Sequence, residues 1–252
     1  MGILNITPDS FYDGKKLLTA ESIQNNLSKI INADIIDVGA ESSRPFSNQI
    51  NEEDELKRLS LLNDCDFRGK VLSIDSYKYN VIKHCLDNGF RMINDISGGG
   101  NNFNNINLAC EYNVPIVLMH MQGTPENMQK NPYYYNVIDQ IKSFFDKRIN
   151  YASKIGMKEK DIILDPGIGF GKTIKDNDEI ILNLSSLKKE GYPLMIGVSR
   201  KSFLSTDDAP ESRLSASLGV LAISIMNGAN IVRVHDVCES KNMIKIIDRI
   251  KN

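Results

Sequence analysis

The stretch from Asp165 to Lys172 combines a carboxylate with a glycine-rich loop, and it follows a short apolar run at residues 161–164. The apolar run predicts a buried strand, which Pro166 and three glycines bring to an end. Glycines let a backbone approach a ligand closely because they carry no side chain. In parallel α/β folds, functional sites form where a strand ends in such a loop. A plain βα turn, with the Asp capping the next helix, is the alternative that this motif alone leaves open.

Further polar side chains fall at or near the ends of the other apolar runs. They are Asn5, Asp37, Asp75, Asn94, His120, Lys201, Arg233 and His235. Each one alone has a plain explanation, such as a helix cap for Asp75 or a surface cation for Lys201. Their joint occurrence at one edge is harder to explain by structure alone, because a buried polar group costs free energy unless it is paired. We therefore expect one polar site at the carboxyl ends of the strands.

The residue types divide this expected site into two halves. The first half comprises Asp75, Asn94 and Asp165, and the second comprises Asn5, Arg233 and His235. Carboxylate and amide groups suit a flat heterocycle that carries N–H donors and a carbonyl. The donors of the second half suit a phosphate or a metal-bound phosphate, and Lys201 suits either half. An acid–base hydrolase is conceivable, although no Ser or Cys lies in a nucleophile motif.

Apolar runs alternate with helical patterns along the whole chain. The runs that predict strands are 2–6, 34–38, 71–75, 91–95, 115–120, 161–164, 194–198 and 230–235. The helical patterns cover about 20–32, a segment from Asn51, 79–88, a short helix toward Tyr112, 134–155, 178–189, 211–227 and the end of the chain. Eight such units in 252 residues match an α/β (β/α)8 TIM barrel with eight parallel strands. A doubly wound open sheet is the alternative, and we expect a single domain over residues 1–252.

Composition excludes several classes of partner. The net charge is −2 and the isoelectric point is near 6.0, so we expect no non-specific binding to nucleic acid or to a membrane surface. No apolar run approaches the roughly 18 residues of a membrane span, and no signal-peptide pattern opens the chain. The four cysteines have no metal-ligand spacing, which indicates reduced thiols and a cytoplasmic protein.

Eight segments together resemble the motif series of the dihydropteroate synthases, in that family's order. They are MGILNITPDSF, DVGAESSRP, SIDSYK, INDISGG, LMHMQGTPENMQ, LDPGIGFGK, GVSRKSF and GANIVRVHDV, from Met1 to about Val237. The resemblance implies a (β/α)8 barrel, dependence on Mg²⁺ and a homodimer. It also implies an activity in folate synthesis. In that reaction, 6-hydroxymethyl-7,8-dihydropterin pyrophosphate condenses with 4-aminobenzoate to give 7,8-dihydropteroate and pyrophosphate.

The same resemblance implies a role for each matched residue. Pterin binding falls to Asp75, Asn94, Asp165 and Lys201, and pyrophosphate binding to Asn5, Ser43, Arg233, Val234 and His235. The 4-aminobenzoate site comprises Thr7, Pro8, Ser43, Arg44, Pro45, Phe170, Ser199 and Lys201, and Asn5 is the Mg²⁺ ligand. The catalytic residues are Asp75, Lys201, Arg233 and His235. Ionisation is the implied mechanism: pyrophosphate departs, Asp75 stabilises the pterin methylene cation, and the amine of 4-aminobenzoate attacks it.

The sequence departs from the family pattern at three places. Ser43 stands where the family commonly has Thr, Phe46 follows Arg-Pro where the family has Gly, and the chain begins inside the first predicted strand. The loops 7–14 and 39–48 are long for βα connections, so we expect both to be mobile and the two substrates to bind in order. A methyltetrahydrofolate methyltransferase domain and a non-catalytic pterin-binding protein are the alternative functions.

Overall fold

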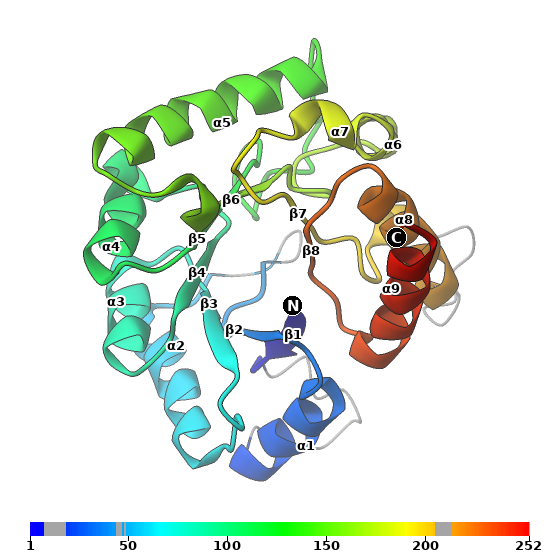
Figure 1. Ribbon diagram of the computed structural model, residues 1–252. Coiled ribbons are helices and arrows are strands. Elements are labelled where there is room, and N and C mark those ends of the chain that lie inside the picture. The colour runs from blue at the N-terminus through cyan, green and yellow to red at the C-terminus, as the bar shows by residue number, and fades with distance from the viewer. Residues whose placement is uncertain (8–18, 44–46, 48, 205–212, 252) are drawn as a thin grey trace.

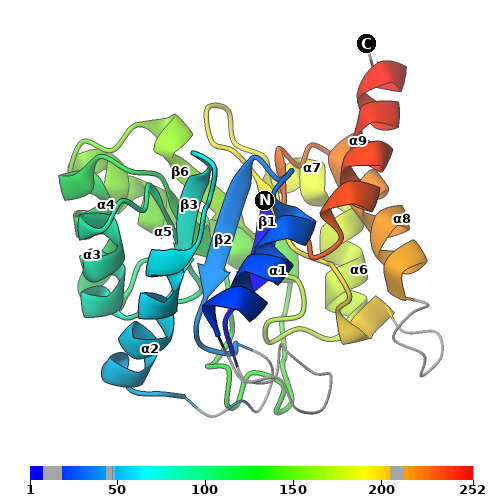
Figure 2. The same cartoon turned by 90° about the horizontal axis from the view of Figure 1, so that it is seen from below.

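A computed structural model describes residues 1–7, 19–43, 47, 49–204 and 213–251. Parallel strands occupy the centre of the molecule, and helices surround them (Figure 1). The strands are β1 (Gly2–Asn5), β2 (Ile35–Gly39), β3 (Val71–Asp75), β4 (Met92–Asp95), β5 (Ile116–Met119), β6 (Ile162–Asp165), β7 (Met195–Ile196) and β8 (Ile231–Val232). Figure 2 shows β1, β2 and β3 side by side, as their parallel pairing requires. Residues 8–14, 44–46 and 48, which include Phe46, lie outside the described residues, and the mobility expected of loops 7–14 and 39–48 stays a prediction.

The strands close into a barrel. β1 to β6 pair in chain order, and β7 pairs with β8. Single bridges join these two sheets at both edges, Leu164 to Leu194 and Gly2 to Val234. Backbone hydrogen bonds support the second junction, with Ile3 N to Val234 O and Val234 N to Met1 O both at 3.0 Å. The predicted (β/α)8 barrel is confirmed, and the open doubly wound sheet is excluded.

The helices fill the spaces between strands on the outside of the barrel. They are α1 (Ala20–Ile30), α2 (Glu52–Leu59), α3 (Tyr79–Asp87), α4 (Asn104–Tyr112), α5 (Val137–Lys154), α6 (Ile174–Leu182), α7 (Leu184–Leu187), α8 (Arg213–Met226) and α9 (Val237–Lys251). Short 3₁₀ segments lie at Ser60–Asp64, Asn101–Phe103, Glu159–Asp161 and Ser202–Leu204. Among the described residues, every helix is too short or too polar to cross a membrane.

The predicted helix at 178–189 was wrong at both ends. α6 begins earlier because Thr173 and Asp176 form a capping box, in which the Thr173 hydroxyl accepts from Asp176 N at 3.2 Å. The Asp176 carboxylate accepts in return from Thr173 N at 2.8 Å. α6 then stops at Asn183, whose backbone leaves helical geometry, and α7 follows as a separate turn. The T-x-x-D spacing was the sequence signal for the true start.

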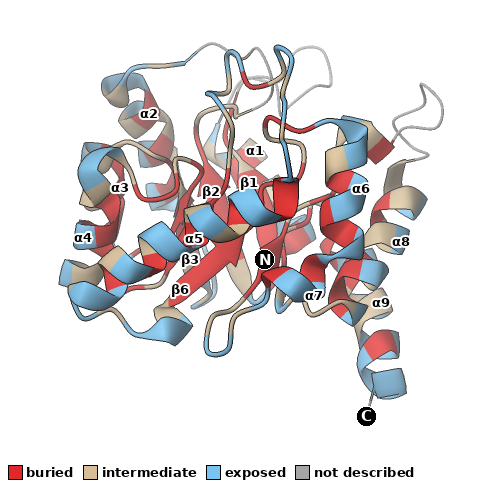
Figure 3. Ribbon diagram, turned by 90° about the horizontal axis from the view of Figure 1, so that it is seen from above, coloured by how far each residue is buried: buried red, intermediate tan, exposed pale blue. Residues whose placement is uncertain are grey.

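Alternate strand residues belong to two different cores, because side chains in a strand point to opposite faces in turn. One set packs under the helices and includes Leu4, Ile36, Val38, Ile74, Ile93, Ile116, Leu118, Ile162 and Leu164. The other set points into the barrel, where Met1, Met92, Val117, Ile163 and Met195 form a separate apolar cluster. Figure 3 shows the strands buried and the outer surfaces of the helices exposed.

Polar residues continue the inward-facing set toward the carboxyl ends of the strands. Asn94 and Asp165 come two residues after Met92 and Ile163, so they share the same face of their strands. Register places Asn5 opposite Gly39, Gly39 opposite Asp75, and Asp75 opposite Asn94. The barrel interior is therefore apolar near the amino ends of the strands and polar near their carboxyl ends.

The glycine-rich loop after β6 lies directly against the end of β5. Gly167 has a φ of 68°, and a Cβ added there would lie 2.0 Å from the carbonyl oxygen of His120. No side chain can occupy that space without moving the backbone of a neighbouring strand. The glycine is therefore required both by its backbone conformation and by the close approach.

We predict that Gly167→Ala lowers the free energy of unfolding by about 2–4 kcal/mol, because left-handed strain adds to a backbone clash. Gly156→Ala is the matched control, since Gly156 also has a positive φ, of 93°, but nothing lies within 4 Å of its added Cβ. Strain alone should cost about 1 kcal/mol there. Denaturant unfolding of both variants measures the difference, and equal losses would contradict the proposed clash.

Candidate active site

One large cavity opens at the carboxyl ends of the strands, with a volume of about 1040 Å³. It brings together most of the predicted site residues: Asn5, Thr7, Ser43, Asp75, Asn94, Asp165, Phe170, Ser199, Lys201, Arg233 and His235. These residues come from both ends of the chain and from seven of the strand ends or the loops after them. The cavity is therefore the product of barrel closure.

Four predicted residues need separate mention. Pro8, Arg44 and Pro45 lie outside the described residues. Val234 does not line the cavity, because its side chain is buried in the core beneath the helices. Its N–H donates to Met1 O and its C=O accepts from Ile3 N, as part of the closure of the barrel. The Val234 N–H is therefore not available to bind pyrophosphate, as was predicted for it, and we leave Val234 out of the anion site.

Arg233 forms an ion triplet with two carboxylates at the centre of the cavity floor. Its Nε donates to Asp37 Oδ2 at 2.6 Å, and its Nη2 donates to Asp75 Oδ2 at 2.5 Å. Asn94 also donates to Asp37 Oδ2, at 2.8 Å. Asp37 is fully buried, and within the described chain its other oxygen has no hydrogen-bond partner. Asp37 thus orients both the arginine and the amide.

The charges in this triplet are strongly perturbed. Burial raises the pKa of Asp75 to about 7, with the neighbouring Asp37 adding to the rise and Arg233 opposing it. Burial by itself would lower the pKa of Arg233, but Asp37 and Asp75 outweigh burial and raise it. Arg233 therefore stays cationic, while Asp75 can carry a proton near neutral pH. Perturbed groups that share a cavity are typical of functional sites.

The glycine-rich loop is held by side chains from three directions. Lys172 donates from Nζ to the carbonyl oxygens of His120 and Phe170, at 3.2 and 3.0 Å, and approaches His120 Nδ1 at 3.1 Å. Gln129 donates to Gly169 O at 2.7 Å, and Gly169 N donates to Asn177 Oδ1 at 2.8 Å. Asp165 also accepts from Gly167 N at 2.7 Å, which orients its carboxylate. The loop is a rigid wall of the cavity.

Lys201 packs against the same loop, beside the ring of Phe170. The Lys201 ammonium lies 4.5 Å from the centre of the Phe170 ring and donates to the carbonyl oxygen of Ile168. Burial lowers the pKa of Lys201 to about 8, against the attraction of Asp165. Beside them, Ser199 Oγ lies 3.2 Å from both the backbone nitrogen and Nδ1 of His235. This wall offers one aromatic face beside several donors.

Sequence reasoning gave no role to Asp37, Lys172, Gln129 and Glu41, although all four belong to the site or its support. Asp37 was recognised as a polar residue near a strand end, and its position two residues before Gly39 places it on the inward face. Lys172 appeared in the sequence only as the last residue of the glycine-rich stretch, with no role of its own. Gln129 and Glu41 carry no periodic signal, because they lie in loops.

Lys172 provides a test of this geometry through pH. Burial lowers its pKa from 10.5 to about 7, so between these values the unfolded chain binds more protons than the folded one. Stability should therefore rise with pH across this window. We predict that the wild type gains about 2 kcal/mol relative to Lys172→Met between about pH 7 and about pH 9.5. Urea unfolding measures the gain, and Lys175→Met, at an exposed position of α6, is the control. A pH-independent difference would place the Lys172 ammonium in water.

Comparison with known proteins identifies the family of this chain. Residues 1–235 match the family described as pterin binding enzyme. The dihydropteroate synthase of Haemophilus influenzae is 36% identical over 98% of this chain and 91% of its own length. That of Clostridium beijerinckii is 39% identical, over 99% of this chain and 93% of its own.

Solved structures agree in fold over the whole chain. The dihydropteroate synthase of Yersinia pestis, solved with a sulfonamide drug, superposes with a TM-score of 0.91 at 35% identity, covering 100% of this chain and 93% of its own. The Xanthomonas albilineans enzyme in complex with 7,8-dihydropteroate superposes with a TM-score of 0.85 at 29% identity, covering 100% and 92%. The chain therefore belongs to the family of pterin-binding enzymes, among the dihydropteroate synthases.

Proposed function

We propose that this chain condenses 6-hydroxymethyl-7,8-dihydropterin pyrophosphate with 4-aminobenzoate, giving 7,8-dihydropteroate and pyrophosphate. The observation that carries the proposal is the single cavity with two chemically different halves. Carboxylate and amide acceptors line one half, cationic and hydroxyl donors line the other, and Arg233 touches both. The named activity of the relatives supports the same reaction.

The pterin would occupy the half formed by Asp75, Asn94, Asp165 and Lys201. Its pyrimidinone edge presents adjacent N–H donors, which a carboxylate accepts in pairs. Asp165 suits this role because Gly167 N already fixes one of its oxygens at 2.7 Å. Asn94 is oriented by its bond to Asp37, so its amide oxygen is directed away from that carboxylate. Both groups are therefore arranged before a ligand arrives.

The pyrophosphate would bind Arg233, His235, Ser43 and Asn5. A guanidinium has five N–H donors, and Asp37 and Asp75 each take one of them, which leaves donors for phosphate oxygens. Ser43 and His235 line the same cavity. Arg233 can therefore hold the anion without leaving its buried partners.

Asn5 suits a Mg²⁺ ion that is held mainly by substrate. Within the described residues, no cluster of three acidic, His or Cys side chains could bind a metal alone. Mg²⁺ in phosphate sites uses one or two protein oxygens together with phosphate and water, and a single carboxamide fits that pattern. Asn5 Oδ1 and Asp75 Oδ2 both lie 3.4 Å from the Cβ position of Gly39, so the carboxamide lies beside the site. Bound Mg²⁺ would neutralise charge on the pyrophosphate.

Ionisation is the mechanism that this arrangement favours. The bond between the pterin methylene and the pyrophosphate breaks, and the electron pair leaves with the pyrophosphate, which Arg233 and His235 stabilise. Asp75 stabilises the cation that remains on the pterin, because a preorganised carboxylate acts strongly where water is excluded. The neutral amine of 4-aminobenzoate attacks the methylene and then loses a proton to solvent. No nucleophile from the protein is needed.

The 4-aminobenzoate would lie beside Phe170, with Ser199, Lys201, Ser43 and Thr7 around it. An aromatic ring packs on the Phe170 face, and the Lys201 ammonium pairs with the carboxylate. These residues line the cavity next to the proposed anion half. Pro8, Arg44 and Pro45, outside the described residues, remain part of the proposed site by resemblance alone.

We also propose a cytoplasmic homodimer. Large apolar side chains are exposed on two neighbouring helices, with Ile223 and Met226 on α8 and Ile246 and Ile250 on α9. Exposed apolar surface of this kind is typical of protein interfaces. The four cysteines are free thiols, as expected in a reducing compartment.

The direct test is product formation from the pterin pyrophosphate and labelled 4-aminobenzoate, with and without Mg²⁺. We expect 7,8-dihydropteroate and pyrophosphate in equal amounts, and strong loss of turnover when Mg²⁺ is chelated. Absence of product with both substrates and Mg²⁺ present would refute the proposed activity.

Asp165→Asn separates binding from stability. The amide keeps the shape but turns a donor toward the ligand and removes the charge, so we expect a loss of about 1.5–3 kcal/mol, or roughly 10- to 100-fold in pterin affinity. Burial raises the pKa of Asp165, which means that its charge is unfavourable in the folded state. Stability at neutral pH should therefore hold or rise. Titration calorimetry and thermal unfolding measure the two effects, and unchanged pterin affinity would remove Asp165 from the pocket.

A further inference from the structure

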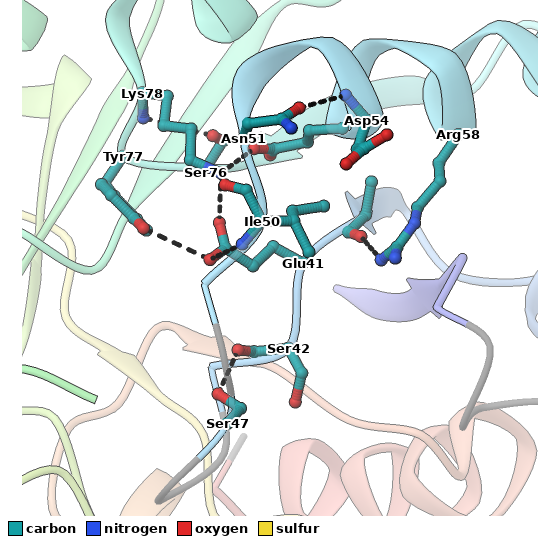
Figure 4. Close-up of polar contacts among 12 residues, drawn as sticks. Glu41, Ser42, Ser47, Ile50, Asn51, Asp54, Arg58, Ser76, Tyr77 and Lys78 are labelled. Atoms are coloured by element: carbon teal, nitrogen blue, oxygen red, sulfur yellow. Dashed lines mark hydrogen bonds and ion pairs between the residues drawn. The ribbon is translucent and has the colours of Figure 1, made fainter. Parts of the chain in front are cut away.

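A buried ion cluster lies behind the second loop, outside the proposed substrate contacts. It contains Glu41 from the start of that loop, Glu55 from α2, and Tyr77 and Lys78 from the turn before α3. Lys78 Nζ donates to Glu41 Oε2 at 2.6 Å, to Glu55 Oε2 at 2.7 Å and to Ile50 O at 2.7 Å. Figure 4 shows Lys78, Tyr77, Ile50 and Glu41 around the base of the loop.

The cluster ties the two ends of the loop together. Glu41 Oε1 accepts from Ile50 N at 3.3 Å, while Lys78 binds both the Glu41 carboxylate and the Ile50 carbonyl. Tyr77 donates its hydroxyl to Glu41 Oε1 at 3.3 Å. Residues 41 and 50 are therefore held at a constant separation by side chains. Arg58 adds a further anchor through its bond to Ala40 O at 2.7 Å.

Burial makes this arrangement costly to break. Glu55 is fully buried, and the side chains of Glu41 and Lys78 are only 8% and 11% exposed. Burial alone would lower the pKa of Lys78, but its hydrogen bonds to Glu41 and Glu55 outweigh burial and raise it. The ammonium is thus charged, and its three N–H donors meet three oxygens. A group saturated in this way has no donor left for a ligand, so its role is to hold the protein.

The ion cluster supports the part of the cavity wall that the second loop forms. Ser42 and Ser43 follow Glu41 directly, and all three line the cavity together with Asp75. Ser47 donates to Ser42 O at 2.6 Å and so continues the constraint into the loop (Figure 4). The proposed pterin contacts come instead from Asp75, Asn94 and Asp165 at the ends of β3, β4 and β6 and from Lys201 after β7. Within the described chain, the side chains of the cluster make no hydrogen bond to these four residues. Ser43 is the single proposed contact of the pterin pyrophosphate in this loop, whereas the proposed 4-aminobenzoate site takes several residues from it. A disturbance at Lys78 should therefore affect binding of 4-aminobenzoate more than binding of the pterin pyrophosphate.

We propose that Lys78, with Glu41 and Glu55, is a positioning element that places Ser42 and Ser43 of the second loop for binding of 4-aminobenzoate. Lys78 acts through Glu41 and Ile50 and touches no substrate. The proposal rests on the proposed function for its kinetic consequence. It adds to that function a determinant of affinity for one substrate in which Lys78 and Glu55 do not line the cavity.

The test compares KM for the two substrates in a Lys78→Met, Glu55→Gln double variant. Removing both charges avoids leaving Glu55 buried as a lone anion. We expect KM for 4-aminobenzoate to rise by about tenfold or more, since loss of a charge-assisted contact is worth that much, while KM for the pterin pyrophosphate changes by less than about threefold. The single variant Lys78→Arg, which keeps Glu55, should have wild-type KM values for both substrates, because a guanidinium can also bind two carboxylates.

Lys83→Met is the matched control, on the helix α3 that Lys78 precedes. Lys83 pairs with Asp87 at 2.8 Å but is 45% exposed, and its replacement should leave both KM values unchanged. A parallel rise of both KM values in the double variant, or no rise at all, would overturn the proposal. If the double variant does not fold, Glu41→Gln weakens the same contacts more gently and should show the same selective rise.

Hydrogen exchange separates this proposal from the proposed function. The Ile50 amide bonds to Glu41, so its exchange should accelerate in the double variant and stay slow in Lys83→Met, whatever reaction the chain catalyses. Unchanged exchange at Ile50 would refute the clamp. If the wild type has no turnover but the Ile50 amide exchanges faster in the double variant, the proposed activity is refuted and the structural role of Lys78 is still supported.

Discussion

The ion triplet of Asp37, Arg233 and Asp75 connects the last strand of the barrel to its second and third strands. Arg233 and Asp37 are separated by 196 positions in the chain, yet their side chains meet at 2.6 Å. Breaking one partner of a buried pair leaves an uncompensated charge, which is strongly unfavourable. The floor of the cavity therefore requires a closed barrel with correct register. The proposed pterin and anion halves share this floor, because Arg233 and Asn94 both bond to Asp37.

Around that floor, backbone atoms and fixed side chains provide rigid walls. The glycine-rich loop approaches His120 so closely that only glycine fits at position 167. Lys172 then uses its buried ammonium to hold two carbonyl groups of the same region. The second loop is held differently, by an ion cluster at its base. Both sets of contacts are present before a ligand binds, so ordering of the described parts of these two loops adds little to the entropic cost of binding.

Burial also sets the chemistry of the site. Desolvation raises the pKa of Asp75 and lowers the pKa of Lys201, so both have pKa values near neutrality. A substrate that brings its own charge changes this balance directly. Pyrophosphate would compensate Arg233, and a cationic pterin would stabilise the ionised form of Asp75. The electrostatics of the cavity are therefore suited to charge separation, which is what ionisation of a pyrophosphate ester requires.

The sequence by itself determined the fold class, because eight apolar runs with polar ends leave few arrangements other than a barrel. Local signals also located most helices, and motif order indicated the family. Position along a strand was enough to nominate Asp75, Asn94 and Asp165, since strand ends meet at one rim. What only the tertiary structure decided was which polar groups pair. Asp37 is buried and accepts hydrogen bonds from Arg233 and Asn94. The backbone of Val234 is paired with that of Met1 and Ile3, and Glu41 accepts hydrogen bonds from Lys78 and Ile50. These contacts join residues that are distant in sequence, so neither periodicity nor spacing carries a signal for them; they depend on how the ring of strands closes.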